Sequence, residues 1–484
     1  MKNRQHVRKS RKKLRKTAKK KSQAVVSVDD LLKAASAAME SLDVERAYDA
    51  YRKAASQLQR NETMILPSSI EERAKAEALV QTLEKMGECQ VSIGDQDLAR
   101  DHFSQSLKLL EEGAKNDETS KTANYYETHS SLCFYIGQLS LKYEALEAYR
   151  HGIRSLEECM QCVDEDKNVD SETLRQEADA MEDIRVEEIE KANDDTAMTI
   201  DDDTGNSNTR LRLLLKQKLS DAYCNLAELY LTDLCDEDTA ETDCEGYLEK
   251  ALQLQDVDGE PFVDALQTMA SLRLSQNDKR TEAVPFILRA YEKQRVGSEA
   301  LATLVGLGEE KVDDSRNNDI EPQARELLEV EAANNLPEFE FRCQTAKLLL
   351  ECAGLLDEST TSGNHDTQTK DECITAAILV LGSLLAQNDE VIEIWYLTGC
   401  AFSAKTPPPI GTAKFYLERA RTMLTDIRKA LTEEARFIDD DAERLEIEEQ
   451  LEMNASQMKD VQSKLDELPD EADDDGSSDE MVQG

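Results

Sequence analysis

One pattern recurs along this 484-residue chain and restricts its fold more than any other feature. Two amphipathic segments are joined by a short polar turn, and small residues stand at fixed distances from a large apolar one. In VDDLLKAASAAMESLDVERAYDAYRKAASQL, Ala35 lies twelve residues before Ala47, Tyr51 follows four residues later, and Ala54 three after that. Small residues let two helices approach closely, and the large one fills the space beside them. The pattern therefore predicts helical hairpins.

Further copies have the same pattern; three keep the separation of twelve residues between the small residues, and in the last one it is fourteen. They contain Gly87, Ala99, Phe103 and Ser106; Cys133, Ala145, Tyr149 and Gly152; Ser271, Ala283, Ile287 and Ala290; and Gly399, Ala413, Leu417 and Ala420. Degenerate copies cover residues 221–254, with a lengthened turn, and 338–385, with a polar loop at 357–370. The pattern resembles the tetratricopeptide repeat, which implies an all-α solenoid of about seven hairpins in a right-handed superhelix. The alternative is an ordinary helical bundle with coincidental spacing.

Composition divides the chain into segments. We predict a disordered basic arm at 1–27, N-terminal repeats at 28–162, an acidic insertion at 163–208, central repeats at 209–305, a linker at 306–335, C-terminal repeats at 336–424, a charged helix at 425–468 and a disordered acidic tail at 469–484.

The charge of the chain is strongly asymmetric. The net charge is −43, yet residues 2–21 contain twelve Lys or Arg and no acid, which leaves about −55 on the other residues. A body this acidic repels nucleic acid and anionic membranes and attracts basic proteins. The longest apolar run, residues 374–386, is too short to span a membrane. We therefore expect a monomer that binds a basic client and neither nucleic acid nor membrane.

Motifs for catalysis are missing from the sequence. The five His residues form no metal-binding motif, and no phosphate loop or nucleophile elbow occurs. Cys159 and Cys162 form one C-x-x-C, for which two thiols one turn apart on a helix are favoured over half of a zinc site. The eleven Cys are expected to be reduced core residues. We expect no enzyme activity, no cofactor and no metal.

The repeat register predicts an acidic groove along the first helices of the hairpins. Its predicted residues are Asp29, Glu40, Glu84, Glu88, Glu127, Asp221, Glu228 and Glu393, with Phe134 and Tyr396 between them. Carboxylates would bind the Lys and Arg heads of a client, and apolar side chains would support their stems. The alternative is that these acids only solvate helix faces.

The basic arm is typical of a nuclear localisation signal. The predicted signal residues are Arg8, Lys9, Arg11, Lys12, Lys13, Arg15, Lys16, Lys19, Lys20 and Lys21. We expect a nuclear import receptor as a second partner and shuttling between cytoplasm and nucleus. The alternatives are a nucleic-acid patch, or binding of the arm to the chain's own acidic tail.

Four segments carry a more specific resemblance. These are VSVDDLLKAASAAMESLDVERAYDAYRKA, NLAELYLTDLCDEDTAETDCEGYLEKALQLQ, DALQTMASLRLSQ and IEIWYLTGCAF, in this order within residues 28–424. They resemble the dedicated assembly chaperones of ribosomal protein L-four. The resemblance implies a helical solenoid that shields the long basic internal loop of the client. It also implies that the chaperone escorts the client to the nuclear pre-ribosome of the large subunit. There, ribosomal RNA would compete for the client as a stronger polyanion.

Two other functions stay open. Tetratricopeptide histone chaperones also carry an acidic insertion and a nuclear signal. A co-chaperone adaptor for heat-shock proteins would instead need Lys and Arg in the groove, where this sequence has acids.

Overall fold

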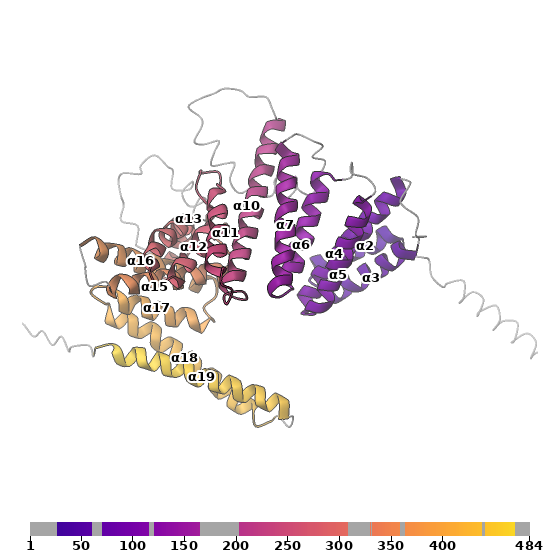
Figure 1. The fold of residues 1–484 in the computed structure, drawn as a ribbon. Coiled ribbons are helices and arrows are strands. Elements are labelled where there is room, and N and C mark those ends of the chain that lie inside the picture. Colours follow the sequence, from indigo (N-terminus) through magenta and orange to yellow (C-terminus); the bar gives the residue numbers. More distant parts are fainter. Residues whose placement is uncertain are drawn as a thin grey trace, which may run out of the picture. The chain divides into compact units, whose positions relative to one another are not determined.

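The computed structural model describes residues 27–60, 70–115, 121–164, 203–307, 330, 332–358, 364–437 and 441–469. Within these ranges every regular element is helical, and one isolated β-bridge joins Gln255 to Pro261 (Figure 1). Successive helices pack against each other as hairpins, which confirms the predicted all-α repeat architecture. The right-handed superhelix stays a prediction.

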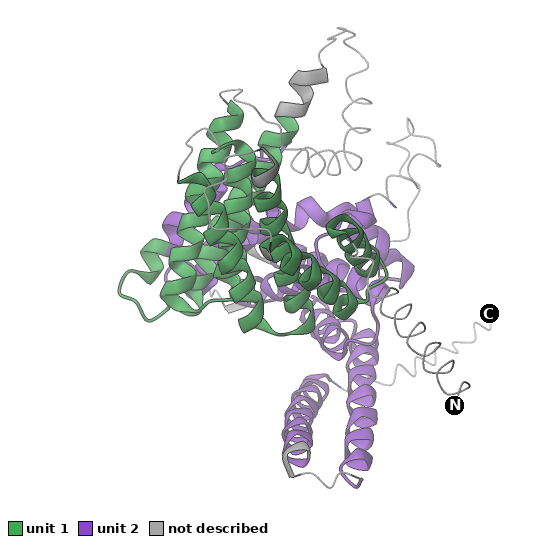
Figure 2. Ribbon diagram, turned by 90° about the vertical axis from the view of Figure 1, so that its right-hand side faces the viewer, with its two compact units in different colours: residues 1–182, 195–243 green, residues 183–194, 244–484 purple. Residues whose placement is uncertain are grey.

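The chain divides into two compact units (Figure 2). Unit 1 contains residues 1–182 and 195–243, and unit 2 contains residues 183–194 and 244–484. The boundary therefore falls inside helix α11 (Ala240–Gln253).

The described residues of unit 1 form three hairpins, one further helix and the start of α11. The hairpins are α2 (Val28–Glu40) with α3 (Val44–Arg60), α4 (Ile70–Ile93) with α5 (Gln96–Ala114), and α6 (Ala123–Gln138) with α7 (Lys142–Asp164). Helix α10 (Asp203–Leu231) packs against α7. N-terminal caps stabilise the first turns of two of these helices. Ser27 Oγ accepts a hydrogen bond from the Asp30 N–H at the start of α2, and Asp95 Oδ1 accepts one from the Leu98 N–H at the start of α5.

The turn inside each of these hairpins contains one residue with a left-handed backbone conformation. The φ angles are +57° at Leu42, +93° at Gly94 and +50° at Lys142. In the first two turns the N–H of the Asp that follows donates a hydrogen bond to the last turn of the preceding helix. The Asp43 N–H donates to the Ala38 carbonyl, and the Asp95 N–H donates to the Gln90 carbonyl. These are Schellman ends, which stop a helix and reverse the chain within a few residues.

Small residues allow the helices of a hairpin to touch, as the sequence pattern predicted. A Cβ added to Gly87 of α4 would lie 2.6 Å from the Phe103 ring of α5. A Cβ added to Gly152 of α7 would lie 2.4 Å from the Phe134 ring of α6. In each hairpin the glycine of one helix and the aromatic ring of the other therefore pack directly against each other.

Unit 2 continues the hairpins after α11. Its helices are α12 (Val263–Ser275), the short 3₁₀ helix η2 (Arg280–Glu282), α13 (Ala283–Leu304), α15 (Phe339–Glu358), α16 (Asn364–Gln387), α17 (Ile392–Ala404), α18 (Ile410–Glu434) and α19 (Asp441–Glu467).

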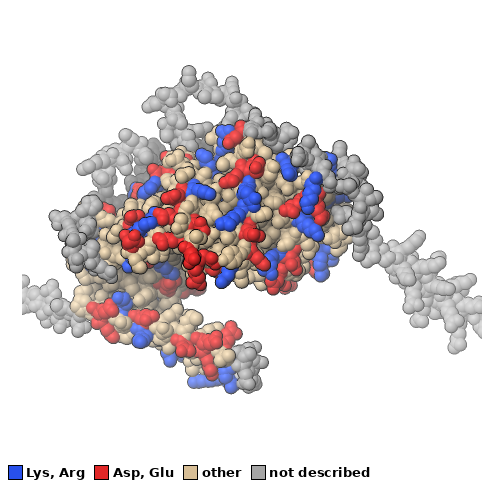
Figure 3. Space-filling view, in the orientation of Figure 1, with Lys and Arg blue, Asp and Glu red and all other residues tan. Residues whose placement is uncertain are grey.

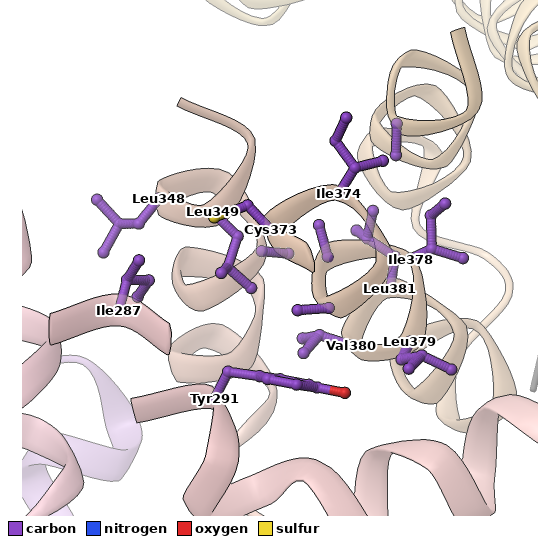
Figure 4. Close-up of a cluster of buried hydrophobic side chains, with 14 of the residues drawn as sticks. Ile287, Tyr291, Leu348, Leu349, Cys373, Ile374, Ile378, Leu379, Val380 and Leu381 are labelled. Carbon is purple, nitrogen blue, oxygen red and sulfur yellow. The ribbon is translucent and has the colours of Figure 1, made fainter. Parts of the chain in front are cut away.

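The core of unit 2 surrounds α16, which contains the longest apolar run of the chain. Helix α16 packs against both α15 and α13, and side chains from all three meet in one buried cluster, including Ile287, Tyr291, Leu349 and Leu381 (Figure 4). A helix that is apolar on all sides is stable when neighbours cover it on all sides. No helix among the described residues is long and apolar enough to cross a membrane.

The structure corrects several predicted boundaries. At the two ends of the segment predicted as the acidic insertion, 163–208, α7 includes Val163 and Asp164 and α10 begins at Asp203. The polar residues from Asn364 onward belong to α16 and not to a loop, because polar side chains are compatible with exposed helical turns. The charged helix predicted at 425–468 is two helices, since α18 continues to Glu434 and α19 starts at Asp441. The basic arm and residues 470–484 lie outside the described residues.

Candidate protein-binding surface

Two of the predicted groove acids lie beside a lysine of their own helix. Lys85 Nζ lies 2.8 Å from a carboxylate oxygen of Glu88 on α4. Burial opposes the charged form of Lys85, but the hydrogen bond to Glu88 and the charges of Glu88 and Glu84 outweigh it and raise the lysine pKa. Both acids are half-buried, and part of their negative charge is already compensated.

Glu127 of α6 has a structural environment. Its side chain is 11 % exposed, and its Oε1 lies 3.1 Å from Lys218 Nζ of α10 and accepts the Ser131 hydroxyl at 3.1 Å. A buried carboxylate held by a lysine and a hydroxyl ties two helices together. Glu127 therefore links α6 to α10.

The other predicted residues are scattered. Asp29 and Glu40 are exposed at opposite ends of α2. On α10, Asp221 is half-buried and Glu228 is exposed. Burial raises the pKa of Tyr149 to about 12, and the nearby negative charge of Glu228 contributes to this increase.

The remaining three take part in helix packing or ion pairing. The Phe134 ring lies against Gly152 and Tyr149 of α7. In unit 2, Tyr396 packs between α17, α18 and α19, and Glu393 pairs with Lys347 at 2.8 Å. Of the ten predicted residues, Glu393 and Tyr396 belong to unit 2 and the other eight belong to unit 1.

The structure brings together a different set of residues in unit 1, which the sequence reasoning missed. Large apolar side chains at the hairpin turns point into solvent: Leu42 is 86 % exposed, Leu141 74 %, Tyr143 56 % and Ile93 44 %. Carboxylates accompany them, with Asp43 after Leu42, Asp95 after Ile93, and Asp233 and Glu237 beside Tyr143. We call these eight residues the apolar–acidic rim.

Contacts between neighbouring hairpins hold these turns near one another. Met39 Sδ and Cys89 Sγ approach to 3.7 Å near the first two turns, and Arg100 of α5 donates to the Leu139 carbonyl at the third turn, at 3.3 Å. The third turn joins the segment after α10 through the Lys142 N–H, which donates to Asp233 Oδ2 at 3.4 Å, and through the Tyr143 hydroxyl, which donates to the Glu237 carboxylate. Four consecutive turns therefore share one edge of unit 1.

The rim carries an excess of negative charge. Residues 232–239 contain four acids and no base. The hydrogen bond to Glu237, together with desolvation and the negative charge of that carboxylate, raises the pKa of Tyr143 and keeps its phenol neutral. Figure 3 shows Asp and Glu side chains interspersed with Lys and Arg over the face that it presents. Exposed apolar groups with carboxylates between them suit a client segment rich in Lys or Arg.

The sequence contained a signal for the rim. Leu42 and Leu141 stand in turns, where polar residues are usual, and each is followed within three residues by an acid. An apolar residue at a turn has no core to enter, so its position predicts a surface contact.

One polar cluster resembles a hydrolase triad but lies inside the helices. His129 Nδ1 is 2.8 Å from Ser155 Oγ, and His129 Nε2 is 3.5 Å from Glu111 Oε1. His129 and Ser155 are both buried, and Ser155 lies within α7. Burial lowers the pKa of His129 and outweighs the opposite effect of Glu111. The cluster joins α5, α6 and α7, and its hydroxyl is covered by the hairpin.

Eight of the eleven cysteines are buried as predicted, whereas Cys162 and Cys400 are half-buried and Cys235 is exposed. Burial raises the pKa of Cys159 to about 12, and its Sγ lies 3.3 Å from the Ala123 carbonyl oxygen. In the part of the chain that the structure describes, no three His, Cys, Asp or Glu side chains are placed to hold a metal ion.

Comparison with known proteins adds evidence from sequence. No protein-family model matches the chain. The chain is similar to a protein of Schizosaccharomyces pombe (strain 972 / ATCC 24843) described as a probable assembly chaperone of rpl4. The resemblance predicted from the sequence is confirmed. The two are 28 % identical over 185 residues, which cover 38 % of this chain and only 39 % of the relative.

Two solved structures are also similar. The assembly chaperone of RpL4 (Acl4, residues 1–338) is 20 % identical, with a TM-score of 0.44 and coverage of 78 % of this chain and 95 % of that one. The hypoxic regulator of sterol synthesis Nro1, described as a nuclear import adaptor, is 11 % identical, with a TM-score of 0.38 and coverage of 84 % and 99 %.

Proposed function

We propose that this protein is a dedicated chaperone that binds newly made ribosomal protein L-four and shields its basic segments until the client joins the large ribosomal subunit. The similarity in sequence to the probable assembly chaperone of rpl4 carries this proposal. The strongly acidic composition supports it, because the carboxylates of the protein can neutralise a basic client in place of nucleic acid.

The apolar–acidic rim is the surface that we propose for client binding. Carboxylates attract and orient Lys and Arg, and Leu42, Leu141 and Tyr143 offer contact for the aliphatic stems. Exposed charge pairs are individually weak, so the apolar contacts contribute affinity and the charges contribute the rate of association and selectivity.

Release follows from competition between polyanions. Ribosomal RNA neutralises many more basic residues per unit length than the rim does, and it gains free energy from the release of counterions. The client would therefore transfer to RNA without any nucleotide-driven step.

Client identity is tested by binding of purified partners to the full chain. Ribosomal protein L-four, an unrelated basic ribosomal protein and core histones would be titrated at physiological ionic strength. The proposal predicts the tightest binding to ribosomal protein L-four. Tighter binding of histones would replace it by the histone-chaperone function.

Transport is the second part of the proposal. We propose that the basic arm, including Arg11, Lys12, Lys13, Arg15 and Lys16, binds an import receptor and directs the complex to the nucleus. Deletion of residues 1–21 should leave client binding intact and keep a fluorescently tagged chain out of the nucleus. Nuclear accumulation of the deletion variant would contradict this role.

A further inference from the structure

Unit 2 exposes an aromatic surface where α17 packs against α18. Phe415 of α18 is 59 % exposed and forms an edge-to-face pair with Trp395 of α17, with ring centroids 6.4 Å apart. The guanidinium of Arg419 lies over the Trp395 ring, 5.6 Å from its centroid. Lys414 precedes Phe415 on the same helix. We call these four residues the aromatic–cationic patch.

The cations of the patch are available to a ligand. Among the described residues, the ion pairs of α18 and α19 join Arg421 to Glu418 and Lys464 to Glu467. Neither Lys414 nor Arg419 belongs to an ion pair there. In a chain with a net charge of −43, two cations without a carboxylate partner beside an exposed aromatic ring favour an acidic ligand.

An acidic segment starts next to this patch. Leu465 and Leu468, at the end of α19, pack in the same apolar cluster as Trp395 and Leu417. The described chain ends at Pro469, and residues 470–484 contain seven acids and no base. Fifteen residues extend up to about 50 Å, so reaching the patch from Pro469 requires only part of this length.

We propose that residues 470–484 dock on the aromatic–cationic patch. Carboxylates of this segment pair with Lys414 and Arg419, and the chain covers the exposed Phe415 ring and the half-buried Trp395 beside it. The attachment costs little entropy, because a tethered segment binds as an intramolecular ligand at high effective concentration. The segment thereby shields an aromatic surface that would otherwise be open to non-specific contacts.

Trp395 is the only tryptophan of the chain and reports on its own patch. Acrylamide quenching of its fluorescence would be compared between the full chain and a variant that ends at Pro469. We expect stronger quenching in the shortened variant, and reversal of this difference by a synthetic peptide of residues 470–484. A peptide with Asn and Gln in place of Asp and Glu should not reverse it. Equal quenching of both proteins would overturn the proposal.

Two further measurements separate docking from indirect effects. In the Lys414→Gln variant, removal of residues 470–484 should change the quenching less than in the natural chain. Carbodiimide, which joins carboxylates to amines in direct contact, should link Lys414 to acids of residues 470–484 in the full chain, as read by mass spectrometry. Links from these acids to the basic arm in place of Lys414 would assign the segment to a different site and overturn the proposal.

Discussion

The turn residues decide both the geometry of the hairpins and the composition of their edge. A left-handed φ angle is easy for glycine and costly for residues with a Cβ. Gly94 meets this requirement without strain, whereas Leu42 and Lys142 adopt it with side chains. At Leu42 the chain thus keeps an exposed leucine where glycine would be more stable.

Gly94→Ala should lower the free energy of unfolding by about 1 kcal/mol, because alanine is disfavoured at φ +93°. Gly113 is the matched control, since it lies within α5 with ordinary φ and open space around a Cβ. Gly113→Ala should raise the stability by about 0.5–1 kcal/mol. Urea unfolding measures both, and a destabilised Gly113→Ala would show that backbone conformation does not separate the two sites.

Leu42→Gly tests whether stability and binding are opposed at the rim. The variant should gain about 0.5–1 kcal/mol in unfolding free energy, because glycine relieves the left-handed backbone. It should also bind ribosomal protein L-four more weakly, because an exposed apolar contact is removed. Isothermal titration and urea unfolding give the two values, and unchanged affinity would remove Leu42 from the proposed surface.

Pairs of residues at contacts between helices were predictable, and solvent-facing residues were not. The spacing that links Gly87 to Phe103 identified a real contact, because small and large residues are complementary only when helices touch. The groove acids had no such constraint. An acid on a helix can pair within its helix, as Glu88 does, or link two helices, as Glu127 does, and the residue type is the same in both cases.

Between elements, the Glu127–Lys218 pair is the clearest test of a structural role for a predicted binding residue. Glu127→Gln should destabilise unit 1 by about 1–3 kcal/mol, since it leaves the Lys218 ammonium without its carboxylate. Glu158→Gln, an exposed acid of α7, should change stability by less than about 0.5 kcal/mol. Weaker client binding by Glu127→Gln with unchanged stability would instead restore Glu127 to the binding surface.

The contact of α5, α6 and α7 at His129 makes stability depend on pH. Burial lowers the folded-state pKa of His129 below 6.5, so the unfolded chain takes up a proton first as the pH falls. The contribution of neutral His129 is therefore complete above about pH 6.5 and is lost as the pH falls toward the lower folded-state pKa.

The His129→Gln variant cannot titrate at this position and isolates the effect. Its stability deficit relative to the natural chain should be smaller at about pH 5.5 than at about pH 7.5. Chemical unfolding at both values measures the difference. A deficit that does not change with pH would show that His129 has the same pKa in the folded and unfolded states.

The hairpin periodicity gave helix positions in advance, but helix lengths depended on neighbours. Helix α18 runs ten residues beyond its predicted end, and the polar start of α16 was assigned to a loop. Polar residues are compatible with exposed helical turns and with loops, so local sequence does not separate these states.

At the scale of the whole molecule, charge is the property that connects sequence to function. The sum of the charges was evident from composition, and it predicted the class of partner. The surface that we propose for binding could be found only in the structure, because the turns of separate hairpins become neighbours only when the hairpins stack. The rim is the result of that stacking.

Acids that flank the apolar–acidic rim isolate the electrostatic contribution to client binding, because the four rim carboxylates themselves also accept hydrogen bonds that hold the turns. Glu45, Glu144 and Asp236 are exposed acids in or next to the turns of unit 1, and changing them to Gln, Gln and Asn removes three negative charges there. Glu77, Glu112 and Glu158 are exposed acids toward the opposite end of the same hairpins, and their change to Gln is the matched control.

The dissociation constant for ribosomal protein L-four, measured over a range of salt concentrations, is the most direct test of the central claim. The natural chain and the control variant should show the same affinity, weakening steeply with salt. The variant with the three flanking acids neutralised should bind more weakly at low salt and show a shallower salt dependence, because these charges add to the negative field of the rim. Equal salt dependence in all three proteins would contradict client binding through negative charge at this edge of unit 1.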